Sequence, residues 1–145
     1  MGELSKEIYA ERENVEKALD NLKIVMARPE KSVIELSAIA TFLHNIYNGV
    51  ENILKQALKI KDIQVPRSTT WHKDLLNFSV SSGIISERLS DELYRYMTFR
   101  HFFIHAYGFM LDEEQLKDLA ENIATVWLQF LLEIEEYSRG IDQAV

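Results

Sequence analysis

The 145-residue chain lacks cysteine, so disulfides and thiolate metal sites are excluded. Proline and glycine are scarce, at two and five residues, which favours long uninterrupted helices. No apolar run is long enough to span a bilayer. The opening residues, MGELSKEIYAERENVEK, are charged throughout and lack the apolar core of a signal peptide. We therefore expect a cytoplasmic protein without a membrane partner.

Charge is unevenly distributed along the chain. The net charge of −7 argues mildly against a dedicated nucleic-acid-binding protein. Residues 112–145 hold nine acids and two bases, which equals the whole net charge. Residues 55–74 hold five bases (Lys55, Lys59, Lys61, Arg67 and Lys73) against Asp62 and Asp74, a balance of +3. This basic segment is either a solvated surface or a guide for an RNA backbone.

Apolar residues recur at helical spacing almost everywhere. The pattern predicts long helices over residues 3–27, 32–60, from about 86, and from 112 to about 138, with a short helix over 71–80. Ser32 is a candidate cap for the second helix, and Asp112 with Gln115 for the last. The predicted fold class is all-α: an antiparallel helical bundle of four long helices plus one short helix, in a single domain over residues 1–145.

The helix that starts near residue 86 carries the most informative stretch, RHFFIHAYG, at residues 100–108. Arg100 falls on the apolar stripe of this helix, where an unpaired charge is costly. His101 and His105 share a second face, with Phe99 and Phe102 on or near it. A helix that is apolar nearly all round is either central in a bundle or lies at a subunit interface, and we favour the interface.

Arginine and histidine together suggest phosphate chemistry. An arginine fork can hold a phosphate and the charge that develops on it, and a histidine can accept or donate a proton. His105 lies near the helix end that Gly108 predicts, where an imidazolium is favoured. RNA supplies its own nucleophile, the 2′-hydroxyl, so such a pair can cleave it without a metal. Tyr107 can orient the histidine or contact a base.

Arg100, four intervening residues, His105 and then Tyr107 resemble the motif of the HEPN superfamily, in particular HepT-type toxins of toxin–antitoxin pairs. His101, directly after the arginine, also fits. The resemblance implies a homodimer whose motif helices form a composite cleft, and metal-independent endoribonuclease activity that leaves a 2′,3′-cyclic phosphate. It implies no cofactor, and a nucleotidyltransferase antitoxin that can adenylylate Tyr107. An acidic residue on the second helix often supports the site, and Glu51 is the candidate.

Other interpretations of these residues stay open. Arg100 can form a structural ion pair, for example with Glu51, and His105 can be only a helix cap. Tyr107 can be a core tyrosine, and Glu51 a surface residue paired with Lys55. The chain can also be a non-catalytic HEPN-like module that binds a nucleotidyltransferase or a nucleotide, or a purely structural bundle.

The remaining histidines give weaker signals. His101 and His105 have the spacing of a helical zinc site, but Phe102 stands where metalloproteases have their acid, so we expect no metal. His44 and His72 are expected to be helix-surface or packing residues.

Overall fold

Five helices make up the described part of the chain. The computed structural model describes residues 2–105 and 112–143, and helix is the regular element throughout these residues. The helices are α1 (Glu3–Met26), α2 (Val33–Ile60), α3 (Trp71–Ser81), α4 (Glu87–His105) and α5 (Glu113–Gln143). The predicted class, four long helices plus one short helix in an antiparallel bundle, is confirmed. Within the described residues, none of these helices is long and apolar enough to cross a membrane.

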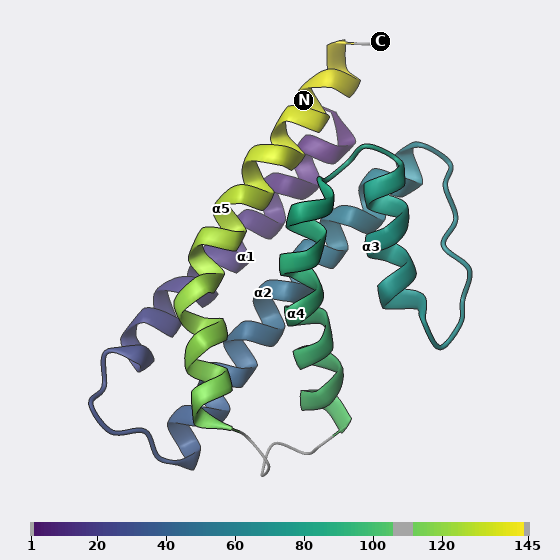
Figure 1. Ribbon diagram of the computed structural model, residues 1–145. Coiled ribbons are helices and arrows are strands. Elements are labelled where there is room, and N and C mark those ends of the chain that lie inside the picture. Colours follow the sequence, from purple (N-terminus) through teal and green to yellow (C-terminus); the bar gives the residue numbers. More distant parts are fainter. Residues whose placement is uncertain (1, 106–111, 144–145) are drawn as a thin grey trace.

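The helices run back and forth along the bundle (Figure 1). Helices α1 and α5 lie side by side and bring the two ends of the chain to the same end of the molecule. Helix α2 is the central element, because it packs against α1, α3, α4 and α5. Its buried side chains form the middle of one continuous apolar core. Tyr47 and Glu51 of α2 are accordingly buried, at 1% and 3% exposed.

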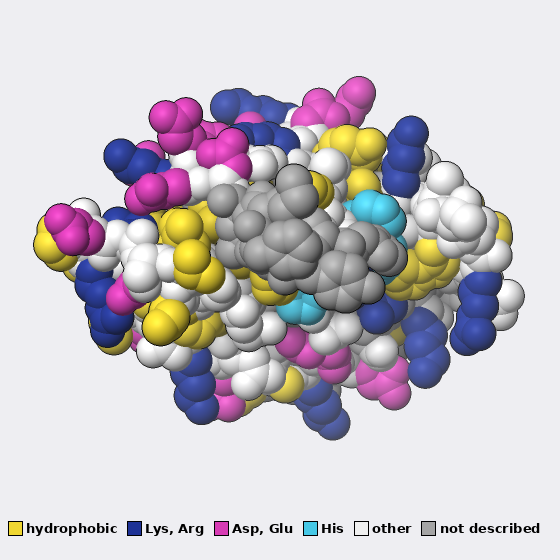
Figure 2. All heavy atoms as spheres, turned by 90° about the horizontal axis from the view of Figure 1, so that it is seen from below, with side chains coloured by type: hydrophobic (Ala, Val, Ile, Leu, Met, Phe, Trp, Pro, Cys, Tyr) yellow, Lys and Arg dark blue, Asp and Glu magenta, His cyan; other side chains and the backbone are white. Residues whose placement is uncertain are grey.

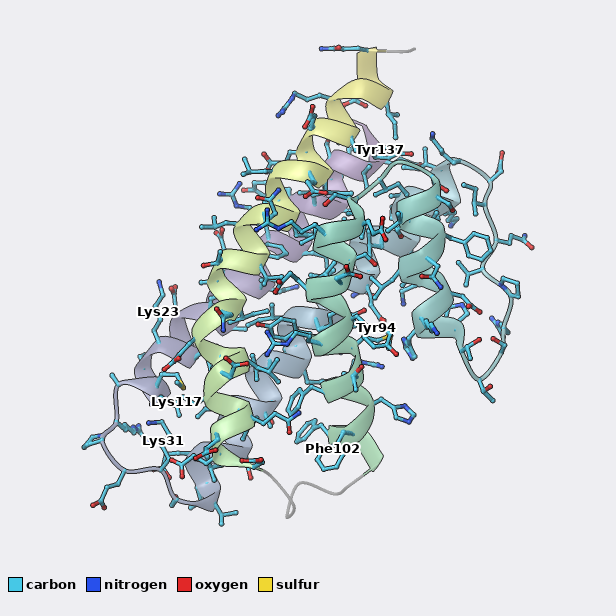
Figure 3. The ribbon with its side chains drawn as sticks, viewed as in Figure 1. Lys23, Lys31, Tyr94, Phe102, Lys117 and Tyr137 are labelled. Atoms are coloured by element: carbon cyan, nitrogen blue, oxygen red, sulfur yellow. The ribbon has the colours of Figure 1, made fainter. Side chains whose placement is uncertain are left out.

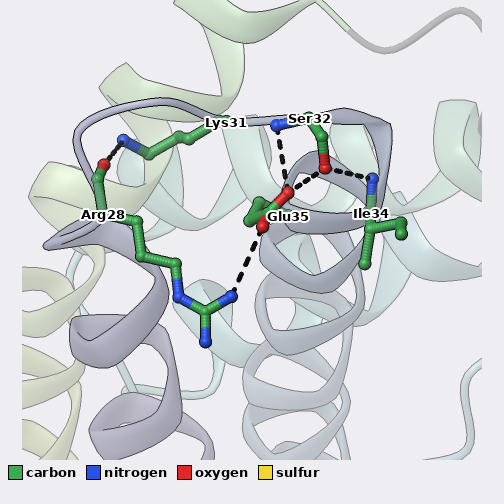
Figure 4. Close-up of polar contacts among 5 residues, drawn as sticks. All are labelled: Arg28, Lys31, Ser32, Ile34 and Glu35. Carbon is green, nitrogen blue, oxygen red and sulfur yellow. Dashed lines mark hydrogen bonds and ion pairs between the residues drawn. The ribbon is translucent and has the colours of Figure 1, made fainter.

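The start of α2 is fixed by the predicted cap (Figure 4). The Ser32 Oγ accepts a hydrogen bond from the Ile34 N–H at 3.2 Å, and the Glu35 carboxylate accepts one from the Ser32 N–H at 3.0 Å. Glu35 also bonds the Ser32 hydroxyl, which lowers the pKa of this carboxyl group. The Arg28 guanidinium adds a contact of 3.4 Å to the other carboxylate oxygen. This capping box satisfies backbone donors that the first turn leaves unpaired.

Two details differ from the sequence-based expectation. Helix α5 continues to Gln143 instead of ending near Ser138, because its last turns stay attached to α1: the Ser138 and Ser5 hydroxyls are 2.9 Å apart, and Ile141 packs against the core. Phe99, which was expected on or near the face of His101 and His105, lies on the buried side of α4. It is 3% exposed and stacks on Phe103, four residues later, with 6.0 Å between ring centroids.

Helices α1 and α2 approach closely at Gly49. A Cβ atom at this position would lie 2.5 Å from Cγ2 of Val15, which is 1% exposed. Valine has one strongly preferred rotamer in a helix, so its methyl group cannot swing away cheaply. Gly140 on α5 is the opposite case, because an added Cβ there meets nothing within 4 Å.

We predict opposite effects of alanine at these two helical glycines. Gly49→Ala should lower the free energy of unfolding by up to about 2 kcal/mol, since overpacking costs about 1–3 kcal/mol against a helix-propensity gain of about 1 kcal/mol. The control Gly140→Ala should raise it by about 0.5–1 kcal/mol. Urea denaturation followed by circular dichroism measures both. A Gly49→Ala variant as stable as Gly140→Ala would contradict the close approach of α1 and α2.

Candidate active site at Arg100

Arg100 lies on α4 and points toward α2 and α3. Its Nε–H donates a hydrogen bond of 2.8 Å to Oδ1 of Asn48 on α2. Its Nη1 lies 3.3 Å from Nε2 of His72 on α3. The side chain is half-buried, and the described residues occupy two of the five N–H groups that a guanidinium carries. The remaining N–H groups are free of bonds to described residues and can bind an anion.

The donors of Arg100 fix the protonation pattern of its neighbours. Arginine has no acceptor, so Nε2 of His72 must accept the bond from Nη1. The proton of a neutral His72 then lies on Nδ1, which faces Oε2 of Glu51 at 2.8 Å. The carboxylate therefore orients the imidazole, and the imidazole orients the guanidinium. A buried acid on α2 holds Arg100 through an intermediate histidine.

Glu51 is the most enclosed charge of this group, with 3% of its surface exposed. A buried carboxylate is stable only when hydrogen-bonded, and His72 supplies the bond. The nearby Tyr47 is also buried, at 1% exposed. Burial raises the pKa of the Tyr47 hydroxyl well above its ordinary value, and the Glu51 carboxylate raises it further. Tyr47 therefore stays neutral beside Glu51, so the pocket holds one carboxylate and no phenolate.

Asn48 continues the chain of polar contacts on its other side. Its Oδ1 accepts from Arg100, so the group 3.1 Å from Nε2 of His44 is the amide Nδ2, a donor. His44 must accept this bond, which requires a neutral ring. The pKa of His44 is lowered from 6.5 because burial disfavours the imidazolium, and the Arg100 charge lowers it further. The ring also contacts Phe103 of α4, with centroids 5.9 Å apart.

The structure brings together part of the predicted set of site residues. Arg100 and Glu51 belong to one cluster, but their interaction passes through His72, so the proposed direct ion pair between them is wrong. The alternative of Glu51 as a surface residue is also wrong, because the side chain is buried. His101 is exposed on α4. His105 is the last residue of α4; its side chain and all of Tyr107 lie outside the described residues.

Sequence reasoning missed three members of the cluster: Asn48, His44 and His72. Those on α2 carried a signal, because His44, Asn48 and Glu51 are spaced by four and three residues and so share one helix face. No sequence signal identified His72, because this residue of α3 contacts Arg100 only in the folded bundle. His44 and His72 were expected only at the surface or in packing, yet both orient the arginine network.

The described residues contain no group of three or more histidine, cysteine, aspartate or glutamate side chains placed to hold a metal ion. The spacing of His101 and His105 as a zinc pair is not tested, because the His105 side chain is outside those residues. The contacts of Arg100 with Asn48 and His72 leave N–H groups that are suited to binding an anion.

We predict that His44 makes stability depend on pH. Its folded-state pKa lies below its unfolded value, so the unfolded chain binds the proton first, and the free energy of unfolding falls as pH drops below about 6.5. His44→Gln keeps an acceptor for Asn48 but does not titrate. Urea denaturation at pH 7.5 and pH 5.5 should show a smaller loss of stability on acidification in the variant. Equal losses in variant and wild type would contradict the assignment of a partly buried, neutral His44.

Comparison with known proteins identifies the family to which this chain belongs. A solved structure described as a cytosolic protein of unknown function, YutE from Bacillus subtilis, has the same fold, with a TM-score of 0.62 and 19% sequence identity over 87% of this chain and 89% of that one. A search of curated proteins gave no match. The model of a family described as HepT-like protein matches residues 38–141, which include α3, α4 and most of α2 and α5. The chain belongs to the HepT-like protein family.

Proposed function

We propose that this protein is a metal-independent endoribonuclease whose site is completed by a second copy of the chain. The observation that carries the proposal is the fixed guanidinium of Arg100: Asn48 and His72 hold it on one side, and its remaining N–H groups are available to a phosphate. Membership of the HepT-like family supports the same chemistry, since the Arg100–His105–Tyr107 motif is the one expected of such toxins.

The proposed reaction needs no metal. Arg100 binds the scissile phosphate and stabilises the charge that develops on it. His105 takes the proton of the ribose 2′-hydroxyl as the 2′-oxygen attacks phosphorus. The bond from phosphorus to the 5′-oxygen breaks, and that oxygen takes a proton from an imidazolium or water. The products are a 2′,3′-cyclic phosphate and a free 5′-hydroxyl.

The second copy is proposed for geometric reasons. Arg100 and His105 are five residues apart, which places them roughly 140° apart around a regular helix. On a single helix the two side chains therefore point in different directions. Two facing copies of the helix can bring Arg100 of one chain and His105 of the other to the same site. The exposed aromatics of α4 support this interface: Tyr94 is 44% and Phe102 42% exposed, and both project from α4 (Figure 3). Such surfaces are typical of contact faces.

The proposal also includes control of the activity. His101 and Tyr107 would position or regulate the site, and a nucleotidyltransferase antitoxin would adenylylate Tyr107. An adenylyl group beside the motif would add a phosphate that competes with RNA for Arg100. This part of the proposal rests on the family motif.

Cleavage of total RNA and tRNA in EDTA tests the activity. We expect products with cyclic-phosphate ends, and a rate loss of about 10²-fold or more in His105→Ala, since general acid–base catalysis contributes 10²–10⁴-fold. Arg100→Lys should lose activity as well, because lysine keeps the charge without the fork. The control Arg95→Ala removes an exposed arginine of the same helix, which pairs with Asp118, and should cut like wild type.

The protein for this assay must be folded by circular dichroism and free of adenylylated Tyr107 by mass spectrometry. Failure of such protein to cleave any RNA would contradict the ribonuclease proposal. It would favour the second class, a non-catalytic module that binds a nucleotidyltransferase or a nucleotide.

Mixed dimers test the composite site. A dimer of one Arg100→Ala chain and one His105→Ala chain still has one intact arginine and one intact histidine on opposite chains. If the site is shared, the mixed dimer should recover up to about half of the wild-type activity, while each pure mutant dimer stays inactive. Recovery is measured after co-expression with two affinity tags. A monomer at micromolar concentration by analytical ultracentrifugation, or no recovery in the mixed dimer, would contradict the shared site.

A further inference from the structure

A basic groove lies beside the Arg100 cluster. Its lining includes Lys55 and Lys59 of α2, Asp62 and Arg67 of the following loop, and Trp71 at the start of α3. The hollow has a volume of about 1070 Å³. Lysine and arginine side chains lie on both flanks of the face drawn in Figure 2, including the right-hand side, where this loop and α3 lie. Lys55, Lys59, Arg67 and Trp71 form the surface of this basic groove.

The bases of the groove are not neutralised by the protein. Lys55, Lys59 and Arg67 are exposed, and none of the ion pairs among the described residues includes them. Two arginines elsewhere are paired: Arg12 contacts Glu16, and Arg95 contacts Asp118. Asp62 is the acid in the groove's lining, so three positive charges face one negative charge. In a chain with a net charge of −7, this local excess is suited to an anionic ligand.

The groove connects directly to the arginine cluster. Trp71 precedes His72 and meets its ring edge-on, with centroids 5.0 Å apart. The Lys55 ammonium lies 5.5 Å from the Trp71 ring centroid and follows Glu51 by one helical turn. Lys55 and Lys59 are seven and eleven residues after Asn48, so they lie about 10 and 16 Å further along α2. An extended polyanion held by Arg100 can therefore continue along α2 into the groove.

We infer that the basic groove binds a single-stranded RNA segment next to the phosphate held by Arg100. The lysines and Arg67 contact successive phosphates, and Trp71 stacks against an unpaired base. This pairing of a charged groove with an aromatic ring is the usual design of single-strand binding sites and gives little sequence preference. The aromatic ring favours a single strand over a duplex, whose bases are stacked on each other. The inference rests on the proposed ribonuclease function for its substrate class.

Salt dependence tests the phosphate contacts. Binding of a fluorescent single-stranded oligoribonucleotide is measured by anisotropy at several salt concentrations, in a His105→Ala background that prevents cleavage. Adding Lys59→Gln and Arg67→Gln should weaken binding by about tenfold at ~0.1 M salt and reduce the slope of log K against log salt by about 1.4, or about 0.7 for each phosphate contact. The matched control Lys6→Gln with Lys23→Gln removes the same charge from exposed positions on α1 and should change neither.

Tryptophan fluorescence tests the base contact. Trp71 and Trp127 are the two tryptophans of the chain, and Trp127 is 2% exposed in the core. The oligoribonucleotide should quench the emission of Trp71, whereas inorganic polyphosphate, which has no bases, should bind without this quenching. Trp71→Leu should abolish the quenching and weaken RNA binding about fivefold or more.

Several results would overturn the inference: equal salt slopes in the groove variant and the α1 control, equal binding of duplex RNA, or equal quenching by polyphosphate. Binding of anionic lipid vesicles with the same dependence on Lys59 and Arg67 would assign the groove to a membrane surface instead. Cleavage is measured separately, with His105 intact. If that protein does not cut RNA but the groove results hold, the catalytic proposal fails and the binding site stands. If RNA is cut equally well by the groove variant, the groove inference alone fails.

Discussion

The charge of Arg100 is the constraint on which the rest of the site depends. A guanidinium on the inward side of a helix has to be satisfied by hydrogen bonds, and arginine only donates. Asn48 and His72 must therefore accept, which directs the Asn48 amide toward His44 and the His72 proton toward Glu51. The donor and the acceptor of each hydrogen bond are therefore fixed. Arg100 is therefore held by side chains of α2 and α3. The buried carboxylate of Glu51 lies on the other side of the His72 ring.

Much of the fold was predictable from the sequence because it depends on local signals. The scarcity of glycine and proline and the regular apolar spacing predicted all five helices, and Ser32 with Glu35 forms the capping box at the predicted residue. The end of α5 was placed too early, because its last turns are held by contacts with α1, such as that of Ser138 with Ser5, which is 133 residues away in sequence. Contacts of that kind have no local signature.

The site was predictable only where one helix carries it. Arg100 was identified because a charge interrupts an apolar stripe, and Glu51 because of the family resemblance. His72 was beyond sequence reasoning, since its role exists only when α3 packs against α2 and α4. Periodicity describes one helix at a time, whereas this cluster is made of three. Phe99, in contrast, could have been placed from one helix alone, because it is four residues before Phe103 on α4 and stacks on it.

The acidic chain and the proposed RNA ligand are compatible because charge acts locally. Carboxylates are spread along α5, from Glu113 to Asp142, while the basic groove and Arg100 lie on α2, the following loop, α3 and α4. At physiological salt the screening length is about 8 Å, so distant acids have little effect on a phosphate in the groove. They can instead repel RNA from other faces and leave one favourable approach. Glu51 is acidic and close to the site, but the His72 ring lies between it and Arg100 and bonds both residues.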